Sequence, residues 1–349
     1  MRPLCVTMMG ACLFIASLAS AQARDYFLPG ATTHTYVVIL AGASPEETYG
    51  NQIRRWCRKL YAILTEAYGC PRDDIILLMN GTDSDGDSIS GEGRREILRE
   101  KVQAIAEKAR PGDQLFFFLI GHGTSDEEEA KFVLTGPDIS GRQFAALLQP
   151  FAAQDIVVVN AASSSYPFCK ALTGPGRVLV SATRSRAEKY NTRFAQYFIA
   201  ALDARAGDRD KNGRVSIWEA FVFATHRVQK WYTDQKRIPT EHATLEDNGD
   251  GIFSLDTGPG HDDGSLAQIA YLDPLVANQA AAPLLPSGDA GLTLTLNAKS
   301  RELERSVFLL RHRKADLPEE PYRQEMEKLL IELARASRQL RQMAEATKR

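Results

Sequence analysis

The sequence predicts an α/β fold in which helices cover both faces of a mostly parallel sheet. Two unbroken apolar runs, 114–124 (QLFFFLIGHGT) and 155–165 (DIVVVNAASSS), end in small residues, and such runs are typical of strands buried on both faces. Strand-like runs also alternate with amphipathic helical stretches at the spacing of βαβ units. In such sheets, chemistry lies just beyond the carboxyl ends of the strands, where His122 and residues 160–163 fall.

Each element follows from a local pattern. The first long helix is amphipathic and ends at Gly69, the second is stopped by Pro111-Gly112, and Gly174-Pro175-Gly176 precedes the last strand of the series. We expect strands at 36–41, 74–79, 115–120, 156–159 and 177–182. We expect helices at 47–68, 94–109, 143–148, 167–172, 192–204 and 216–234. The stretch between the third and fourth strands reads as a surface excursion.

The amino-terminal segment 1–23 predicts a secretory signal peptide. Arg2 provides a positive start, 11–18 falls in a short apolar run, and Ala21-Gln22-Ala23 is a small-x-small cleavage site. The alternative, an uncleaved anchor, needs about 20 apolar residues, more than this run provides. No later segment predicts a membrane span. We therefore expect a secreted or periplasmic protein cleaved after Ala23.

Composition excludes one class of function and disfavours one type of scaffold. Of the 349 residues, 44% are hydrophobic and 25% charged, and the net charge of −2 gives no sign of nucleic-acid binding. Signal cleavage leaves Cys57, Cys70 and Cys169. This odd number disfavours a disulfide framework, and the position of Cys57 on an apolar helical face indicates a core residue.

The chain divides into an α/β body at 24–246, Gly/Asp-rich loops and a linker at 247–298, and a helical carboxy-terminal part at 299–349. The last part predicts a helical hairpin or coiled coil, because Pro318 and Pro321 separate two apolar repeats. The repeats are Leu303, Val307 and Leu310, and then Tyr322, Met326, Leu329, Leu333, Ala336, Leu340 and Met343. The remaining apolar seam is expected either to dock on the body or to mediate self-association or binding of a partner helix.

Several short motifs lie in or next to the predicted strands and helices of residues 35–205. They are Ala41-Gly42, Tyr61, Gly69, Pro111-Gly112-Asp113, His122-Gly123 and the small-residue turn after the fourth strand. In this order they resemble the caspase-like (clan CD) cysteine peptidases, most closely the legumain family (peptidase C13). The resemblance covers half the chain and implies a three-layer α/β/α fold and a cleft that binds an extended peptide.

The resemblance also implies the roles of individual residues. His122 would be the general base and acid, and the backbone of Gly123 and of residue 162 would hold the oxyanion. The family's turn reads acidic-Ala-Cys-x-Ser-Gly, but here it reads Asn160-Ala-Ala-Ser-Ser-Ser, so Ala162 stands in the place of the nucleophile. Without that thiol the family's reaction cannot start. The sequence therefore predicts a catalytically inactive homologue that still binds a peptide.

Two other residues are candidates for the nucleophile. Cys169 lies seven residues after Ala162, roughly 10 Å along a following helix, which is too far to act as the nucleophile without refolding the turn. Ser163 is nearer and remains the alternative, although residues 163–165 also suit turn and helix-capping roles. The arginine-histidine pair of the legumain specificity pocket is absent, because Ala43-Ser44-Pro45 stands there. Specificity for asparagine is therefore not expected.

The stretch 208–219 (DRDKNGRVSIWE) fits the twelve-residue EF-hand loop and predicts calcium binding. Gly213 falls at its sharp turn, and predicted helices flank the loop. The expected ligands are Asp208, Asp210, Asn212, the carbonyl of Arg214, Ser216 and a bidentate Glu219. The alternative is a helix connection without an ion. A second stretch, 246–251, imitates the first half of such a loop but reads better as a turn.

Three functions are consistent with these patterns. The first is an exported, calcium-binding and inactive peptidase homologue that acts by binding a peptide or protein. The second is a hydrolase that uses His122 with Ser163 or with an unrecognised nucleophile. The third is a structural envelope or assembly protein that acts through residues 299–349.

Overall fold

The computed structural model describes residues 26–27, 33–80, 88–273, 287–314 and 317–347. The predicted signal peptide, residues 1–23, lies outside this part of the chain. Among the described residues, no helix is both long enough and apolar enough to cross a membrane.

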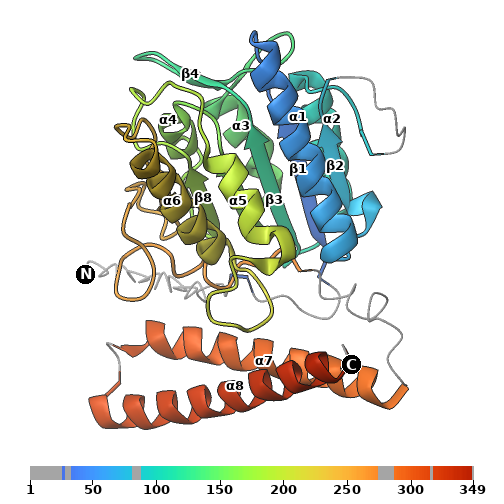
Figure 1. Ribbon diagram of the computed structural model, residues 1–349, viewed down its shortest axis with the longest axis vertical. Helices are drawn as coiled ribbons and strands as arrows, with labels where there is room; N and C mark the ends of the chain where they lie inside the picture. Colours follow the sequence, from blue (N-terminus) through green and yellow to red (C-terminus); the bar gives the residue numbers. More distant parts are fainter. Residues whose placement is uncertain (1–25, 28–32, 81–87, 274–286, 315–316, 348–349) are drawn as a thin grey trace, which may run out of the picture.

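A six-stranded sheet forms the centre of the body, in the order β2-β1-β3-β7-β8-β9 (Figure 1). The first five strands are parallel, and β9 pairs antiparallel with β8. The strands are β1 (Thr35–Ala41), β2 (Ile75–Leu78), β3 (Gln114–Ile120), β7 (Asp155–Asn160), β8 (Arg177–Ser181) and β9 (Thr244–Glu246). The five predicted strands and their parallel direction are thus confirmed.

Helices cover both faces of the sheet, as predicted. One face carries α1 (Glu47–Ala62), α5 (Phe194–Leu202) and α6 (Ile217–Asp234), and the other carries α2 (Arg95–Lys108), α3 (Gly141–Leu148) and α4 (Ser165–Lys170). Alternate strand residues serve the two cores: Phe116 and Phe118 lie in the first, and Leu115 and Phe117 in the second. All four are at most 2% exposed, which explains why residues 115–120 of β3 are all apolar. The three-layer α/β/α class is confirmed.

The structure differs from the sequence prediction at several element boundaries. The helix expected at 47–68 is α-helical only to Ala62 and continues as a π-helical turn, Ile63–Ala67. The surface excursion contains an antiparallel sheet of β4 (Gly123–Ser125), β5 (Ala130–Phe132) and β6 (Ile139–Ser140). Short 3-10 turns are Arg72–Asp74, Gln149–Phe151 and Asp203–Arg205.

The body extends past the boundary expected at 246. Ala267, Ala270 and Leu272 are fully buried in the core beneath α1, α5 and α6, and Leu245 forms an isolated bridge with Ser254. The segment is Gly/Asp-rich because tight turns dominate it, and its composition alone therefore predicted loops outside the body. Only its few small apolar residues show that it packs on the body.

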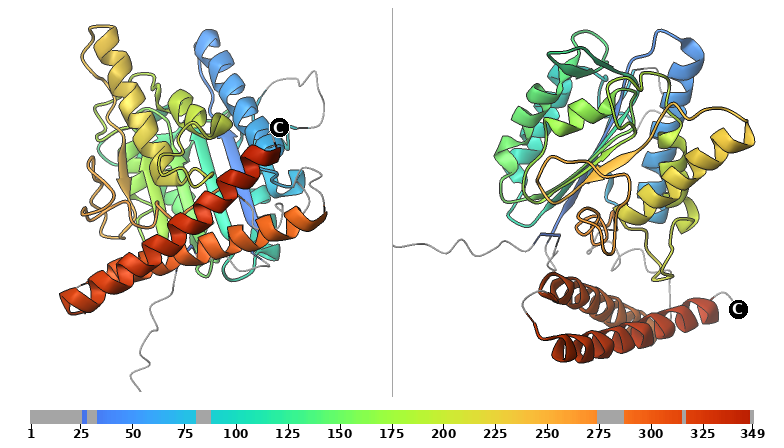
Figure 2. Two further views of the ribbon diagram at one scale, coloured as in Figure 1. Left: turned by 60° about the horizontal axis from the view of Figure 1, so that its bottom comes forward. Right: turned by 90° about the vertical axis from the view of Figure 1, so that its left-hand side faces the viewer.

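Two long helices, α7 (Ser287–His312) and α8 (Glu319–Thr347), lie along one another below the body (Figure 1). Helix α7 begins earlier than the expected residue 299. Leu303, Val307, Leu310 and Ala336 are each at most 7% exposed. Figure 2 shows α8 on the side of α7 that faces away from the body.

Glu241 is a buried carboxyl that links α5 to the segment after α6, and it makes stability depend on pH. It accepts hydrogen bonds from the backbone N–H groups of Arg193 and Phe194 and from the Tyr232 hydroxyl, at 2.9, 3.1 and 3.2 Å. Burial raises the pKa of Glu241 to about 7, from its ordinary value of 4.5. Between these values the folded state holds the proton more tightly than the unfolded state, so stability falls as the pH rises.

We therefore expect Glu241→Gln to flatten the pH dependence of the unfolding free energy between pH 4.5 and 7. At about 1.4 kcal/mol per pKa unit, the change across this window is on the order of 3 kcal/mol. Urea unfolding of both proteins at pH 4.5, 6 and 7.5 measures it. Parallel curves for the two proteins would show that the Glu241 carboxyl does not titrate in this range.

Candidate functional site

The carboxyl ends of β1, β3 and β7 meet at one edge of the sheet, where the predicted catalytic residues lie. The neighbouring strands are in register there, with Ala41 opposite Ile120 and Leu119 opposite Asn160. The chains beyond the strands approach closely: a Cβ on Gly121 would lie 2.7 Å from the Cα of Gly42. The glycines are therefore required by packing at this edge, independently of any catalysis.

His122 is half-buried at this edge, and its ring contacts residues that follow β1. Its Nε2 atom lies 3.3 Å from Ser44 Oγ, and its ring centroid lies 4.8 Å from that of Tyr49. Burial lowers the pKa of His122 below its ordinary 6.5, while the Glu46 carboxylate opposes this shift. The imidazole is therefore neutral near pH 7 and able to accept a proton.

Ser163 bonds to the backbone of Gly123 and not to His122. Its hydroxyl accepts a hydrogen bond from the Gly123 N–H group at 3.2 Å and donates one to the Gly123 carbonyl at 3.1 Å. The Ser163 residue is 1% exposed. A Cβ on Gly123 would lie 2.2 Å from the Ser163 carbonyl oxygen, so this pairing also demands glycine at 123. One of the two expected oxyanion donors is thus engaged within the protein.

The second expected donor is engaged as well. The Ala162 N–H group donates to Asn160 Oδ1 at 3.1 Å. The Ala162 side chain is fully buried and belongs to the core beneath α2, α3 and α4. The position of the family's nucleophile is therefore packed with apolar neighbours. In this conformation neither backbone group points an unpaired donor at a substrate.

The other hydroxyl and thiol groups of the turn are structural. Ser164 is the N-cap of α4 but its side chain makes no capping hydrogen bond, which differs from the helix-capping role expected for residues 163–165. The Ser165 hydroxyl lies 2.8 Å from that of Ser181 and 3.1 Å from that of Thr183. Cys169 is fully buried, and burial raises the pKa of its thiol. These groups fix the turn and do not face His122.

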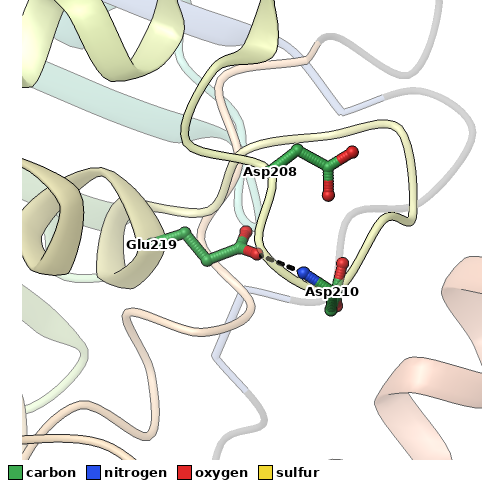
Figure 3. A group of neighbouring side chains, drawn as sticks. All are labelled: Asp208, Asp210 and Glu219. Carbon is green, nitrogen blue, oxygen red and sulfur yellow. Dashed lines mark hydrogen bonds between the residues drawn. The ribbon is translucent and has the colours of Figure 1, made fainter.

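Three carboxylates of the 208–219 loop converge. Each of Asp208, Asp210 and Glu219 places one oxygen within 4.8 Å of the others. Figure 3 shows the three side chains gathered at the loop. Asp208 and Asp210 lie on the loop, whereas Glu219 is on the first turn of α6 and is 4% exposed. Burial and then the charge of Glu219 raise the pKa of Asp210 to about 6. Such crowded negative charge is what a divalent cation relieves.

The loop backbone is wound around its own side-chain oxygens. Asp208 accepts hydrogen bonds from the N–H groups of Asn212 and Gly213 at 3.2 and 3.0 Å. Asn212 Oδ1 accepts one from the Arg214 N–H group at 2.8 Å. Gly213 has a φ of +85°, a left-handed conformation that glycine adopts without strain. The turn at the sixth loop position is thus formed.

Glu219 has four hydrogen-bond donors. Its Oε1 accepts from the N–H groups of Arg209 and Asp210 at 2.9 and 3.3 Å, and its Oε2 accepts from the N–H and hydroxyl groups of Ser216, both at 2.9 Å. A carboxylate has about four acceptor positions, so all of them are filled. An ion that binds Glu219 must therefore replace some of these bonds, and the long bond from Asp210 is the weakest.

Helix α7 contacts the loop, a feature the sequence pattern did not reveal. Glu304 forms an ion pair with Arg214 and lies 3.4 Å from the side-chain nitrogen of Asn212. The Arg214 guanidinium also stacks on the Tyr271 ring, 3.9 Å from its centroid. The side chains at the fifth and seventh loop positions are therefore held by α7 and by the segment before it.

The stretch 246–251 forms a self-bonded turn. Glu246 Oε1 accepts from the Gly249 N–H group at 2.5 Å, Asn248 Oδ1 from Asp250, and Asp250 Oδ1 from Ile252. Within the described ranges, the one group of three or more acidic, His or Cys side chains that meets the spacing of a metal site is that of 208–219.

Comparisons with known proteins give similarity at the level of structure. No protein-family model matches the chain, and no curated protein matches it. A protein of Geobacter sulfurreducens is similar at 13% identity and a TM-score of 0.41, over 61% of this chain and 92% of its own. The Drosophila initiator caspase Dronc is similar at 10% identity and a TM-score of 0.39, over 70% of this chain and 93% of its own. Neither similarity carries an argument about function.

Proposed function

We propose that this protein is an exported, calcium-binding homologue of the caspase-like peptidases, closest to the legumain family, that lacks cysteine-peptidase activity and acts by binding a peptide or protein. The convergence of Asp208, Asp210 and Glu219 within a twelve-residue loop is the observation that carries the proposal. Asn212, Ser216 and the Arg214 carbonyl complete an all-oxygen ligand set, which suits a hard cation such as Ca²⁺.

Calcium titration of the mature protein, residues 24–349, tests the proposal directly. We expect one site by isothermal titration calorimetry, abolished by a chelator and absent with magnesium at equal concentration. Failure to bind calcium at millimolar concentration would remove the central claim. Mass spectrometry of the protein recovered from a secreting host tests export, and the expected amino terminus is Arg24.

The absence of cysteine chemistry rests on the turn after β7. Ala162 supplies no thiol, and the N–H groups of Gly123 and Ala162 already donate to Ser163 and Asn160. A peptide bound at this edge therefore contacts side chains such as His122 and Ser44 and gains little from the oxyanion donors. This arrangement favours binding over transition-state stabilisation.

Restoring the thiol should therefore not restore the enzyme. We expect Ala162→Cys to cleave a broad peptide library no faster than the natural protein, because the new thiol would be buried and the oxyanion donors would stay engaged. Ala162→Cys combined with Ser163→Gly releases the Gly123 N–H group and is the matched comparison. Robust cleavage by the single variant would show an intact family cleft.

One observation favours a second function, that of a serine hydrolase. His122 Nε2 lies within hydrogen-bond distance of Ser44 Oγ, so Ser44 is better placed than Ser163 to be the unrecognised nucleophile. The Ser44 hydroxyl also bonds to Glu46, accepting from its N–H group at 3.2 Å and donating to its carbonyl at 3.0 Å. These two bonds compete with activation by His122, which is why this function ranks second.

Labelling with a fluorophosphonate probe separates the two functions. A hydrolase would be labelled at Ser44, and Ser44→Ala would abolish the labelling while Ser163→Ala would not. Because the pKa of His122 is lowered, the labelling rate would reach half its maximum below pH 6.5. A natural protein that resists the probe at every pH supports the inactive homologue.

A further inference from the structure

Helix α8 carries a second apolar face besides the one that packs on α7. Tyr322, Met326, Leu330, Ile331 and Ala334 line a groove of about 490 Å³ on it. Leu330 and Ile331 are 43% and 44% exposed. Helix α8 lies on the side of α7 away from the body (Figure 2), so in the described structure the body does not cover this groove.

Charge along α8 is divided between its two halves. Residues 319–332 contain five glutamates against two basic residues, and residues 333–347 contain three arginines against one glutamate. The division reaches the groove itself. Glu327, Ile331, Ala334 and Arg338 follow one another at spacings of four, three and four, which places them in one row on the helix. Both charged residues of the row are exposed.

We propose that this face pairs with the same face of a second copy of the chain, with the two α8 helices antiparallel. A two-fold axis between residues 332 and 333 places Ile331 of each copy against Ala334 of the other. The same axis places each Glu327 opposite Arg338 of the second copy. A parallel pair would instead oppose Glu327 to Glu327 and Arg338 to Arg338, which is unfavourable.

The proposal goes beyond calcium binding and does not depend on it. Each α7 contacts its own body through residues such as Glu304, so two paired α8 helices form the centre of the dimer and the two bodies lie on its outer sides. The row from Glu327 to Arg338, which is apolar in the middle and charged at its ends, determines both the antiparallel orientation of the two α8 helices and the choice of partner. A second copy is favoured over another protein because the row complements itself.

Size-exclusion chromatography with light scattering, on the mature chain across a range of concentrations, measures this pairing. We expect a dimer, and we expect Ile331→Asp to produce a monomer with an unchanged circular dichroism spectrum. Gln339→Asp adds the same charge at an exposed position outside the groove and should leave the dimer intact. A natural protein that stays monomeric, or a dimer that Ile331→Asp leaves intact, would overturn the proposal.

Charge reversal tests the orientation. Glu327→Arg and Arg338→Glu should each weaken dimerisation by about tenfold, since each turns two symmetry-related attractive pairs into repulsive ones. The combination of both changes in one chain should restore it, and added salt should reduce all of these differences. A parallel dimer would be insensitive to each reversal, and that result would exclude the antiparallel arrangement.

Discussion

Replacing Glu219 with glutamine is expected to lower the affinity of the 208–219 loop for calcium by at least about a hundredfold. Glu219 brings a buried carboxylate from α6 to the two loop carboxylates. Opposite charges about 4 Å apart interact by about 4 kcal/mol near a protein surface, and about 1.4 kcal/mol corresponds to a tenfold change in affinity. Losing one negative charge next to a divalent ion should therefore lower the affinity for that ion by more than a hundredfold.

Glutamine is the informative replacement because it keeps the shape and one carbonyl acceptor for the capping box with Ser216. Helix α6 should thus still begin at the same residue, and a loss of affinity would report the missing charge. Calorimetric titration of both proteins measures the change. Glu302→Gln removes an equal charge from an exposed position on α7 and should leave the affinity unaltered. An unchanged affinity in Glu219→Gln would place any bound calcium elsewhere.

The same titration followed by nuclear magnetic resonance tests which hydrogen bonds of the loop a bound calcium ion would replace. The N–H groups of Arg209 and Asp210 donate to Glu219 Oε1, in a position that a bound ion would share. Their amide signals should move most on calcium binding, whereas those of Asn212 and Gly213, which bond to Asp208, should move less. Equal shifts along the loop would argue against an exchange of donors at Glu219.

The sheet could be predicted because its information is local. An apolar run such as 115–120 shows that a strand is buried on both faces, and the loop 208–219 has its ligand types at fixed spacings. The contacts that decide the chemistry at the sheet edge join distant residues. Ser163 lies 40 positions from Gly123, and Ser44 lies 78 positions from His122. No periodicity records such a pairing, so the sequence identified the turn but not what its hydroxyls bind.

Contacts between distant residues also explain why the sequence did not predict where the body ends or how α7 contacts it. The strand β9 has only three residues, too few to show a pattern, and it is held by pairing with β8. Glu304 resembles any other charged residue of an amphipathic helix until the fold brings Arg214 beside it. The sequence therefore predicted the elements well, but it could not predict which surface of α7 meets the 208–219 loop.

Breaking the ion pair between Arg214 and Glu304 is expected to destabilise the attachment of α7 by about 3 kcal/mol. The two side chains are only 14% and 13% exposed, and a charge left unpaired in such a place is costly. Arg214→Met leaves Glu304 without its partner. Arg214→Met with Glu304→Leu removes both charges, and we expect it to recover most of the loss, because apolar pairs of similar volume often replace buried ion pairs without cost.

Amide hydrogen exchange of residues 299–310, with urea unfolding in parallel, measures both effects. In Arg214→Met the exchange of this segment should rise by about a hundredfold, since 3 kcal/mol corresponds to roughly two factors of ten, and in the double variant it should return towards the natural rate. If both variants exchange equally fast, the pair contributes specific geometry that packing cannot replace. If neither differs from the natural protein, the ion pair does not contribute to the attachment of α7. If the double variant is more stable than the single one, as we expect, then leaving Glu304 unpaired costs more free energy than removing the whole ion pair.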